Sequence, residues 1–164
     1  MSHFILIRGP GGSGKSTIAK KIQKQSKHKT AILCPDLFYW GIAGKENNKE
    51  VVYEALYRLI DLYLSKDYDV ILEGILSSKI HNELRVKKCI DLAQKYKSKV
   101  FTFFLTLPLD EAIKRDSERE VSMGDKMTKE IFHKSIDSKL DSDIEINTFE
   151  NDFKNVLKII HSNL

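Results

Sequence analysis

Apolar runs of strand length alternate with segments of helical periodicity along almost the whole chain. Strand-like runs occupy residues 4–7, 30–34, 70–72 and 100–105, with a weaker fifth over 143–147. Between and after them, the spacing of apolar residues predicts helices over 15–25, about 49–64, 81–96, 109–119, 128–140 and 149–161. The first strand-like runs are almost continuously apolar, which is typical of parallel strands covered by helices on both faces. The pattern therefore predicts an α/β protein with a doubly wound parallel sheet and ligands outside the carboxyl ends of its strands.

The composition favours one globular domain. The 164 residues contain no repeat, low-complexity tract or linker, so we expect a single domain over residues 1–164. Hydrophobic residues make up 41% and charged residues 30%, which argues against disorder. The formal net charge of +4 is carried by dispersed lysines and arginines, which suits an anionic substrate without requiring a nucleic acid.

The cysteines and the apolar runs suggest neither export nor a membrane. Cys34 and Cys89 have no C-x-x-C partner, so we expect two small core residues in a reducing compartment. The first apolar run is too short for a signal peptide, and no stretch is long enough to span a bilayer. We expect a cytoplasmic protein without a membrane partner.

The most specific motif joins the first strand to the first helix. Residues 9–16 match G-x-x-x-x-G-K-[ST] in full, and the motif lies between a strand-like run and a helical pattern. In such a loop, backbone N–H groups and the helix N-terminus bind phosphate, the lysine reaches the terminal phosphates and the hydroxyl ligates Mg²⁺. We expect the triphosphate of a nucleotide to be held by Gly11, Gly12, Ser13, Gly14, Lys15, Ser16 and Thr17, with Ser16 as a Mg²⁺ ligand.

Two carboxylates are candidates for the chemistry at the same sheet edge. Asp36 follows the second strand, where a carboxylate faces the phosphate loop and can accept a hydroxyl proton, although a turn residue or helix cap would look the same. Glu73 ends the third strand and is a candidate to hold Mg²⁺ through a water or to hydrogen-bond the acceptor, although a strand-end carboxylate in solvent would look the same. Asp69 lies at the opposite end of that strand and is expected at the surface.

A weakly patterned segment over residues 115–126 is a candidate lid. Arg115 and Arg119 are four residues apart, so on a helix they share a face and can close over a triphosphate. The alternative is a surface helix in which Glu111 pairs with Arg115. Gly124 provides a hinge, and the sparse apolar positions predict a segment that is mobile without ligand.

A second departure from a minimal α/β scaffold spans residues 38–48. It opens with Phe38, Tyr39 and Trp40 directly after Asp36 and continues to Gly44 and Lys45. We expect one or two of these rings in the core and a remaining ring available to stack on an acceptor.

These residues resemble the small P-loop kinases of the nucleotide-kinase superfamily, in the group of polynucleotide 5′-kinases, gluconate kinases, chloramphenicol phosphotransferases and zeta-toxin-like proteins. The resemblance rests on residues 9–16, Asp36, Glu73-Gly74, the two arginines and the last strand–helix unit. It implies a P-loop NTPase three-layer sandwich, with five parallel strands in the order 2-3-1-4-5 and a short lid. It also implies ATP and Mg²⁺ as cofactors and catalytic roles for Lys15, Asp36, Arg115 and Arg119.

The leading hypothesis is an ATP-dependent phosphotransferase acting on a hydroxyl of a small molecule or nucleotide. A polynucleotide 5′-hydroxyl kinase is the first alternative, but the dispersed lysines do not favour a nucleic-acid partner. An NTP-binding switch or ATPase module is the second alternative, from another class. No N-K-x-D motif supports a GTP-type switch. The acceptor stays open at this point.

Overall fold

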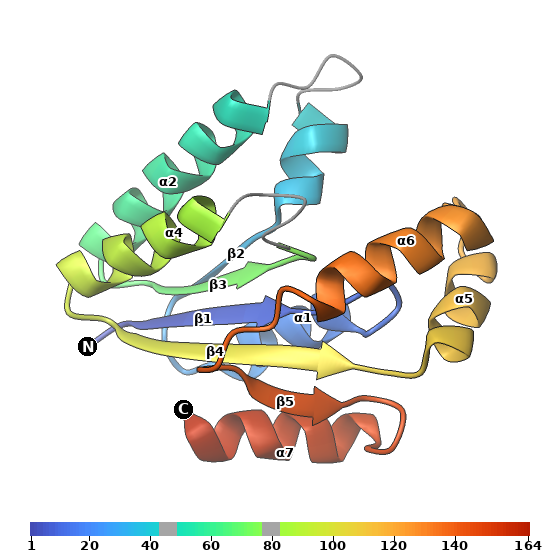
Figure 1. Cartoon of the computed structure of the whole chain (residues 1–164). Coiled ribbons are helices and arrows are strands. Elements are labelled where there is room, and N and C mark those ends of the chain that lie inside the picture. Colours follow the sequence, from blue (N-terminus) through green and yellow to red (C-terminus); the bar gives the residue numbers. More distant parts are fainter. Residues whose placement is uncertain (43–48, 77–82) are drawn as a thin grey trace.

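The computed structural model describes residues 1–42, 49–76 and 83–164, which form a five-stranded parallel sheet with helices on both faces (Figure 1). The predicted segment at Gly44 and Lys45 and the predicted helix start at 81–82 lie outside these residues. In chain order the elements are β1 (His3–Arg8), α1 (Lys15–Gln25), β2 (Thr30–Leu33), a π-helical turn η1 (Leu37–Ile42), α2 (Lys49–Ser65), β3 (Asp69–Glu73), α4 (Glu83–Lys95), β4 (Lys99–Thr106), α5 (Leu109–Ser117), α6 (Asp125–Ile136), β5 (Ile144–Asn147) and α7 (Phe153–Asn163).

The strand order β2-β3-β1-β4-β5 confirms the predicted topology. Each strand joins its neighbour in parallel, with β1 at the centre between β3 and β4. Ile7 of β1 is in register with Glu73 of β3, and the Gly74 N–H donates to the Ile7 carbonyl at 3.1 Å. The carboxyl ends of the two central strands therefore meet at one edge, where Glu73 lies beside the start of the phosphate loop.

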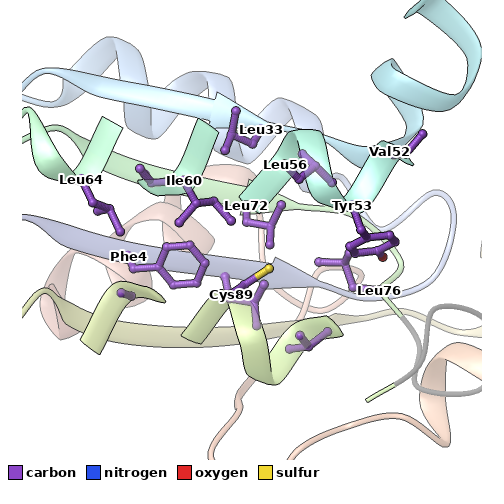
Figure 2. Close-up of a cluster of buried hydrophobic side chains, with 14 of the residues drawn as sticks. Phe4, Leu33, Val52, Tyr53, Leu56, Ile60, Leu64, Leu72, Leu76 and Cys89 are labelled. Atoms are coloured by element: carbon purple, nitrogen blue, oxygen red, sulfur yellow. The ribbon is translucent and has the colours of Figure 1, made fainter. Parts of the chain in front are cut away.

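Two hydrophobic layers explain why the central strands are apolar at every position. Phe4 and Leu6 of β1 belong to a cluster that α2 and α4 cover (Figure 2). Ile5 and Ile7 point to the other face, where α1 and α7 pack on them. Successive side chains of a strand alternate between faces, so a strand covered on both sides needs an unbroken apolar run.

Some predicted boundaries shift for identifiable reasons. The last helix begins at Phe153 rather than at residue 149, because the Asp152 side chain accepts the Asn155 N–H at 2.8 Å and caps the helix there. The predicted helix over 109–119 ends at Ser117, and the one over 128–140 lies at Asp125–Ile136. The shift of the last helix leaves a loop between β5 and α7 next to the phosphate loop.

The surface position predicted for Asp69 is wrong. Only 6% of this residue is exposed, and its carboxylate accepts the His3 N–H at 2.7 Å. The strand begins one residue earlier than its apolar run, so Asp69 pairs with Thr30 of β2 inside the sheet. Among the residues described, no helix is both long and apolar enough to cross a bilayer.

Candidate active site

The phosphate loop connects β1 to α1 with a backbone that favours glycine at three points, Gly9, Gly12 and Gly14, and the first two also lie close to other elements. Gly9 has a φ of 141°, and a Cβ there would lie 2.2 Å from the Leu105 carbonyl oxygen. Gly12 has a φ of 79° and lies against the Cβ of Arg115. These positions place the loop directly over the end of β4 and against α5, so its N–H groups can face a bound anion.

Lys15 is held within the loop. It is 9% exposed, and its Nζ donates to the Pro10 carbonyl oxygen at 2.7 Å. Burial lowers the pKa of Lys15 to about 8, although the negative charges of Glu73 and Asp36 act in the opposite direction. An ammonium with so little water around it gains more from a phosphate than an exposed lysine would.

Glu73 and Ser16 meet across the sheet edge. The Ser16 hydroxyl donates to Glu73 Oε1 at 2.8 Å, and Glu73 is 4% exposed. A hydroxyl and a carboxylate are hard oxygen donors, which suit Mg²⁺. The part of the chain described contains no cluster of three or more His, Cys, Asp or Glu side chains able to hold a metal. That is compatible with Mg²⁺ sites, in which waters and substrate phosphates usually supply most ligands.

Asp36 follows Pro35 after the end of β2, and its carboxyl group interacts with the charges of Lys15 and Glu73. Desolvation is the largest influence on its carboxyl group and raises the pKa of Asp36. The positive charge of Lys15 opposes this rise, and the negative charge of Glu73 adds to it. Asp36, Glu73 and Lys15 therefore interact electrostatically at one edge, as the sequence predicts.

Cys34 is only partly buried, which corrects its assignment to the core. Burial and the neighbouring Glu73 raise the pKa of the Cys34 thiol to about 12. Cys89 is fully buried, as expected. Of the three successive aromatic residues, Tyr39 is 5% exposed and Trp40 is 71% exposed, so the expected division between core and surface is confirmed.

Both predicted lid arginines border the same hollow as the phosphate loop, but only Arg115 does so from a helix. Arg115 in α5 donates to the Gly12 carbonyl oxygen at 3.0 Å and to Glu111 at 2.7 Å. Arg119 lies beyond the end of α5, in the turn that follows. Both line a hollow of about 300 Å³ together with Gly12, Gly14, Lys15, Ser16 and Thr17.

The segment over residues 115–126 has an anchor that the apolar pattern does not show. Asp116 is 2% exposed, and its Oδ2 accepts the Ser122 hydroxyl at 2.7 Å and the Met123 N–H at 2.9 Å. The Met123 methyl group lies 3.4 Å from the place that a Cβ on Gly11 would take, so this side chain extends over the phosphate loop. Polar contacts therefore hold a segment that has few apolar ones.

A second cavity of about 560 Å³ adjoins the first and was not predicted from the sequence. It runs from Gly14 and Arg115 to the loop between β5 and α7, where Phe149 and Asn151 line it. The spacing of apolar residues around Phe149 predicts a helix, so the loop was not recognised in the sequence. Its position after a strand at the carboxyl edge was the available signal.

The sheet order and the phosphate loop define a P-loop nucleotide-binding α/β fold. Residues 4–138 match the family described as an AAA domain (AAA_33), and the chain belongs to this family.

Solved structures with the same fold include several kinases. The chain is similar to a sugar kinase from Janibacter sp. HTCC2649, with 16% identity, a TM-score of 0.66, and coverage of 99% of this chain and 94% of that one. It is similar to the Mycobacterium tuberculosis APS kinase CysC in complex with AMPPNP and APS, with 16% identity, a TM-score of 0.61, and coverage of 98% and 96%.

A chain of the Pnkp1/Rnl/Hen1 RNA repair complex gives a TM-score of 0.70 at 16% identity, covering 86% of this chain and 47% of that one. At such identities the likeness establishes the fold alone. The predicted resemblance to small P-loop kinases is confirmed at that level.

Proposed function

We propose that the protein is an ATP-dependent kinase that transfers the γ-phosphoryl group to a hydroxyl of a small molecule or nucleotide. One observation carries the proposal: Lys15 and Ser16 line one hollow with Arg115 and Arg119. Glu73 accepts the Ser16 hydroxyl, and the charges of Glu73 and Asp36 act on Lys15 at the same edge of the sheet. Phosphoryl transfer needs this combination of a phosphate cradle, metal ligands, a proton acceptor and positive charge.

Each residue has a chemical role in this proposal. The loop N–H groups and Lys15 hold the phosphates, and Ser16 with Glu73 would hold Mg²⁺, directly or through a water. When bound, Mg²⁺ would neutralise charge on the transferring group. Asp36 accepts the proton of the acceptor hydroxyl as that oxygen attacks, and its raised pKa makes it a stronger base than an ordinary aspartate.

Arg115 and Arg119 would spread the negative charge that develops on the phosphoryl oxygens. Arg115 is already oriented by Glu111 and the Gly12 carbonyl. A guanidinium fixed in this way pays little entropy when a phosphate arrives.

The test is the Asp36→Asn variant, after a screen for ADP release stimulated by nucleosides, 5′-hydroxyl oligonucleotides, sugar acids and aminated antibiotics. Transfer should fall by about 10²–10⁴-fold, because the amide keeps the shape but accepts no proton. Calorimetry should show Mg²⁺-ATP binding within a few-fold of wild type. The matched control is Asp91→Asn, an exposed aspartate in α4.

Loss of ATP binding in Asp36→Asn would instead make this residue part of the metal site and Glu73 the next candidate base. Phosphorylation of 5′-hydroxyl oligonucleotides in preference to every small acceptor would favour the polynucleotide kinase. ATP hydrolysis that no acceptor stimulates would favour the ATPase or switch module.

A further inference from the structure

Arg85 in α4 differs from the other arginines of the chain. The sequence contains five, and four of them form ion pairs, which are Arg8–Asp143, Arg58–Glu54, Arg115–Glu111 and Arg119–Asp116. Among the side chains of residues 1–42, 49–76 and 85–164, Arg85 has no such carboxylate partner. A partly buried cation without a counter-charge is costly unless a ligand supplies one.

The guanidinium of Arg85 is nevertheless fixed in place. Its central carbon lies 4.6 Å from the centre of the Tyr53 ring, and Tyr53 is 2% exposed. Figure 2 shows Tyr53 at one end of the hydrophobic cluster, beside Leu76. Stacking occupies the face of a guanidinium and leaves the N–H donors at its edge available, which suits the two oxygens of a carboxylate or a phosphate.

Arg85 and the candidate base Asp36 have a common neighbour in Tyr39. Tyr39 belongs to the same hydrophobic cluster as Tyr53 and follows Asp36 by three residues, in η1. Burial is the main cause of the raised pKa of Tyr39, and the charges of Arg85 and Asp36 then act on this hydroxyl in opposite directions. One buried tyrosine is therefore within electrostatic reach of both residues.

A neighbouring lysine, Lys88, adds a second positive charge to this part of α4. Lys88 lies one turn further along α4, with its Nζ 4.1 Å from the centre of the Tyr57 ring. Its contact with Glu54 is long, at 3.9 Å, and Glu54 already accepts from Arg58 at 3.0 Å. The first two turns of α4 thus present positive charge over tyrosine rings of α2.

We propose that Arg85 binds an anionic group of the phosphate acceptor, so that the acceptor is a hydroxyl compound carrying a carboxylate or a phosphate. This inference rests on the proposed function, because it takes Asp36 as the base at the acceptor hydroxyl. Arg85 would fix the far end of the acceptor while Asp36 receives its proton. An uncharged acceptor would leave the guanidinium unpaired and bind more weakly.

A titration followed by amide chemical shifts tests the binding step without knowledge of the acceptor. ¹⁵N-labelled protein saturated with Mg²⁺-AMPPNP, so that the phosphate loop is occupied, is titrated with inorganic phosphate and, separately, with acetate. Wild type should show saturable chemical-shift changes at residues 85–88 with phosphate if the acceptor carries a phosphate, and with acetate if it carries a carboxylate. Arg85→Ala should weaken that affinity by at least about tenfold.

Arg58→Ala is the matched control, because it removes an exposed, paired arginine of α2 and should bind as wild type does. Arg85→Lys should fall between wild type and Arg85→Ala, since it keeps the charge and loses the fork. Equal affinity in Arg85→Ala and wild type, or no shift at 85–88 with either anion, would overturn the inference. Failure of wild type to bind Mg²⁺-AMPPNP would overturn the proposed function instead.

Paired acceptors identify the source of the anion. Gluconate is compared with glucose for a carboxylate, and thymidine 3′-monophosphate with thymidine for a phosphate. Wild type should prefer the charged member of one pair in kcat/KM, and Arg85→Ala should lose that preference through KM. In the pair to which the enzyme transfers phosphate, a preference for the neutral member would contradict the proposal. A preference for the charged member that is unchanged in Arg85→Ala would contradict it as well.

Discussion

Strand β3 carries a buried carboxylate at each end, and the two ends differ in how the charge is balanced. Asp69 is 6% exposed and Glu73 is 4% exposed. At the amino end, Asp69 accepts the His3 N–H at 2.7 Å and lies 3.3 Å from the Nδ1 of His28. Its partners are residues of the protein itself, so the charge at this end of the sheet is balanced without a ligand.

At the carboxyl end the protein gathers charge that it does not fully neutralise. Glu73 receives the Ser16 hydroxyl, while its negative charge adds to that of Asp36 and acts on Cys34. The hydrogen bonds of the Lys15 ammonium go to neutral acceptors, the Pro10 carbonyl and the Ser13 hydroxyl. Groups held close without mutual neutralisation are typical of functional sites, whereas those at the other end serve folding.

The largest expected effect concerns Lys15. Lys15→Met should lower kcat by at least about a thousandfold, because the ammonium stabilises charge that develops in a water-poor site. The melting temperature should not fall, since a buried charge is replaced by an apolar side chain of similar length. Steady-state kinetics and a thermal melt measure the two effects, and wild-type turnover at saturating ATP would refute the role of the loop.

Substitutions at the two ends of β3 should separate activity from stability. Glu73→Gln should lower kcat by about 10–100-fold, because it weakens the orientation of the metal site, without lowering the free energy of unfolding. Asp69→Asn should leave kcat unchanged and lower the free energy of unfolding by about 1 kcal/mol, because its charge-assisted contacts are lost. Turnover assays and urea titrations check both.

The comparison would fail if Asp69→Asn lowered kcat as much as Glu73→Gln does. It would also fail if Glu73→Gln unfolded at markedly lower urea, since Glu73 would then be a folding residue like Asp69.

The central fold was predictable because burial on both faces forces the strands to be apolar. Phe4 to Ile7 alternates between two cores, so the run is continuous and easy to recognise. The sheet order was available only through the resemblance, since periodicity carries no information about which strands pair. Helix ends were less accessible, because the Asp152 cap competes with an apolar position at Phe149.

The candidate site was predictable where a motif or a strand end fixes a residue. Lys15 and Glu73 belong to this class. Asp116 and Arg85 do not belong to it. The hydrogen-bond partners of Asp116 lie in an irregular segment six to eight residues later, and Arg85 has no carboxylate partner among the side chains of residues 1–42, 49–76 and 85–164. Asp116 lies four residues after buried Ala112 in α5, but this spacing does not reveal the hydrogen bonds that its carboxylate accepts.

The next smaller effect concerns the anchor of the lid segment over residues 115–126. Asp116→Ala removes the acceptor of the Ser122 hydroxyl and of the Met123 and Gly124 N–H groups. Amide exchange over 118–124 should speed up, and KM for ATP should rise several-fold because Arg119 and Met123 lose their position. Glu120→Ala, at an exposed position of the same segment, is the control.

Saturation with a non-hydrolysable ATP analogue should slow exchange across residues 115–126 in wild type. Unchanged exchange there, together with near-normal rates for Arg115→Ala and Arg119→Ala, would leave a salt-bridged surface helix rather than a lid.

The smallest expected effect is a shift in the pH dependence of kcat/KM, which tests whether Asp36 is the base and whether the neighbouring charges set its pKa. Desolvation raises the pKa of Asp36, Lys15 lowers it, Glu73 raises it and Arg119 lowers it. The base must be ionised, so kcat/KM should rise with pH through a pKa above the ordinary aspartate value of 3.8. Glu73→Gln removes a neighbouring negative charge, so this rise should move to lower pH. Arg119→Ala removes a positive charge and should move it to higher pH. Profiles at saturating Mg²⁺-ATP for both variants measure the shifts, and displacement in the same direction would mean that another group titrates.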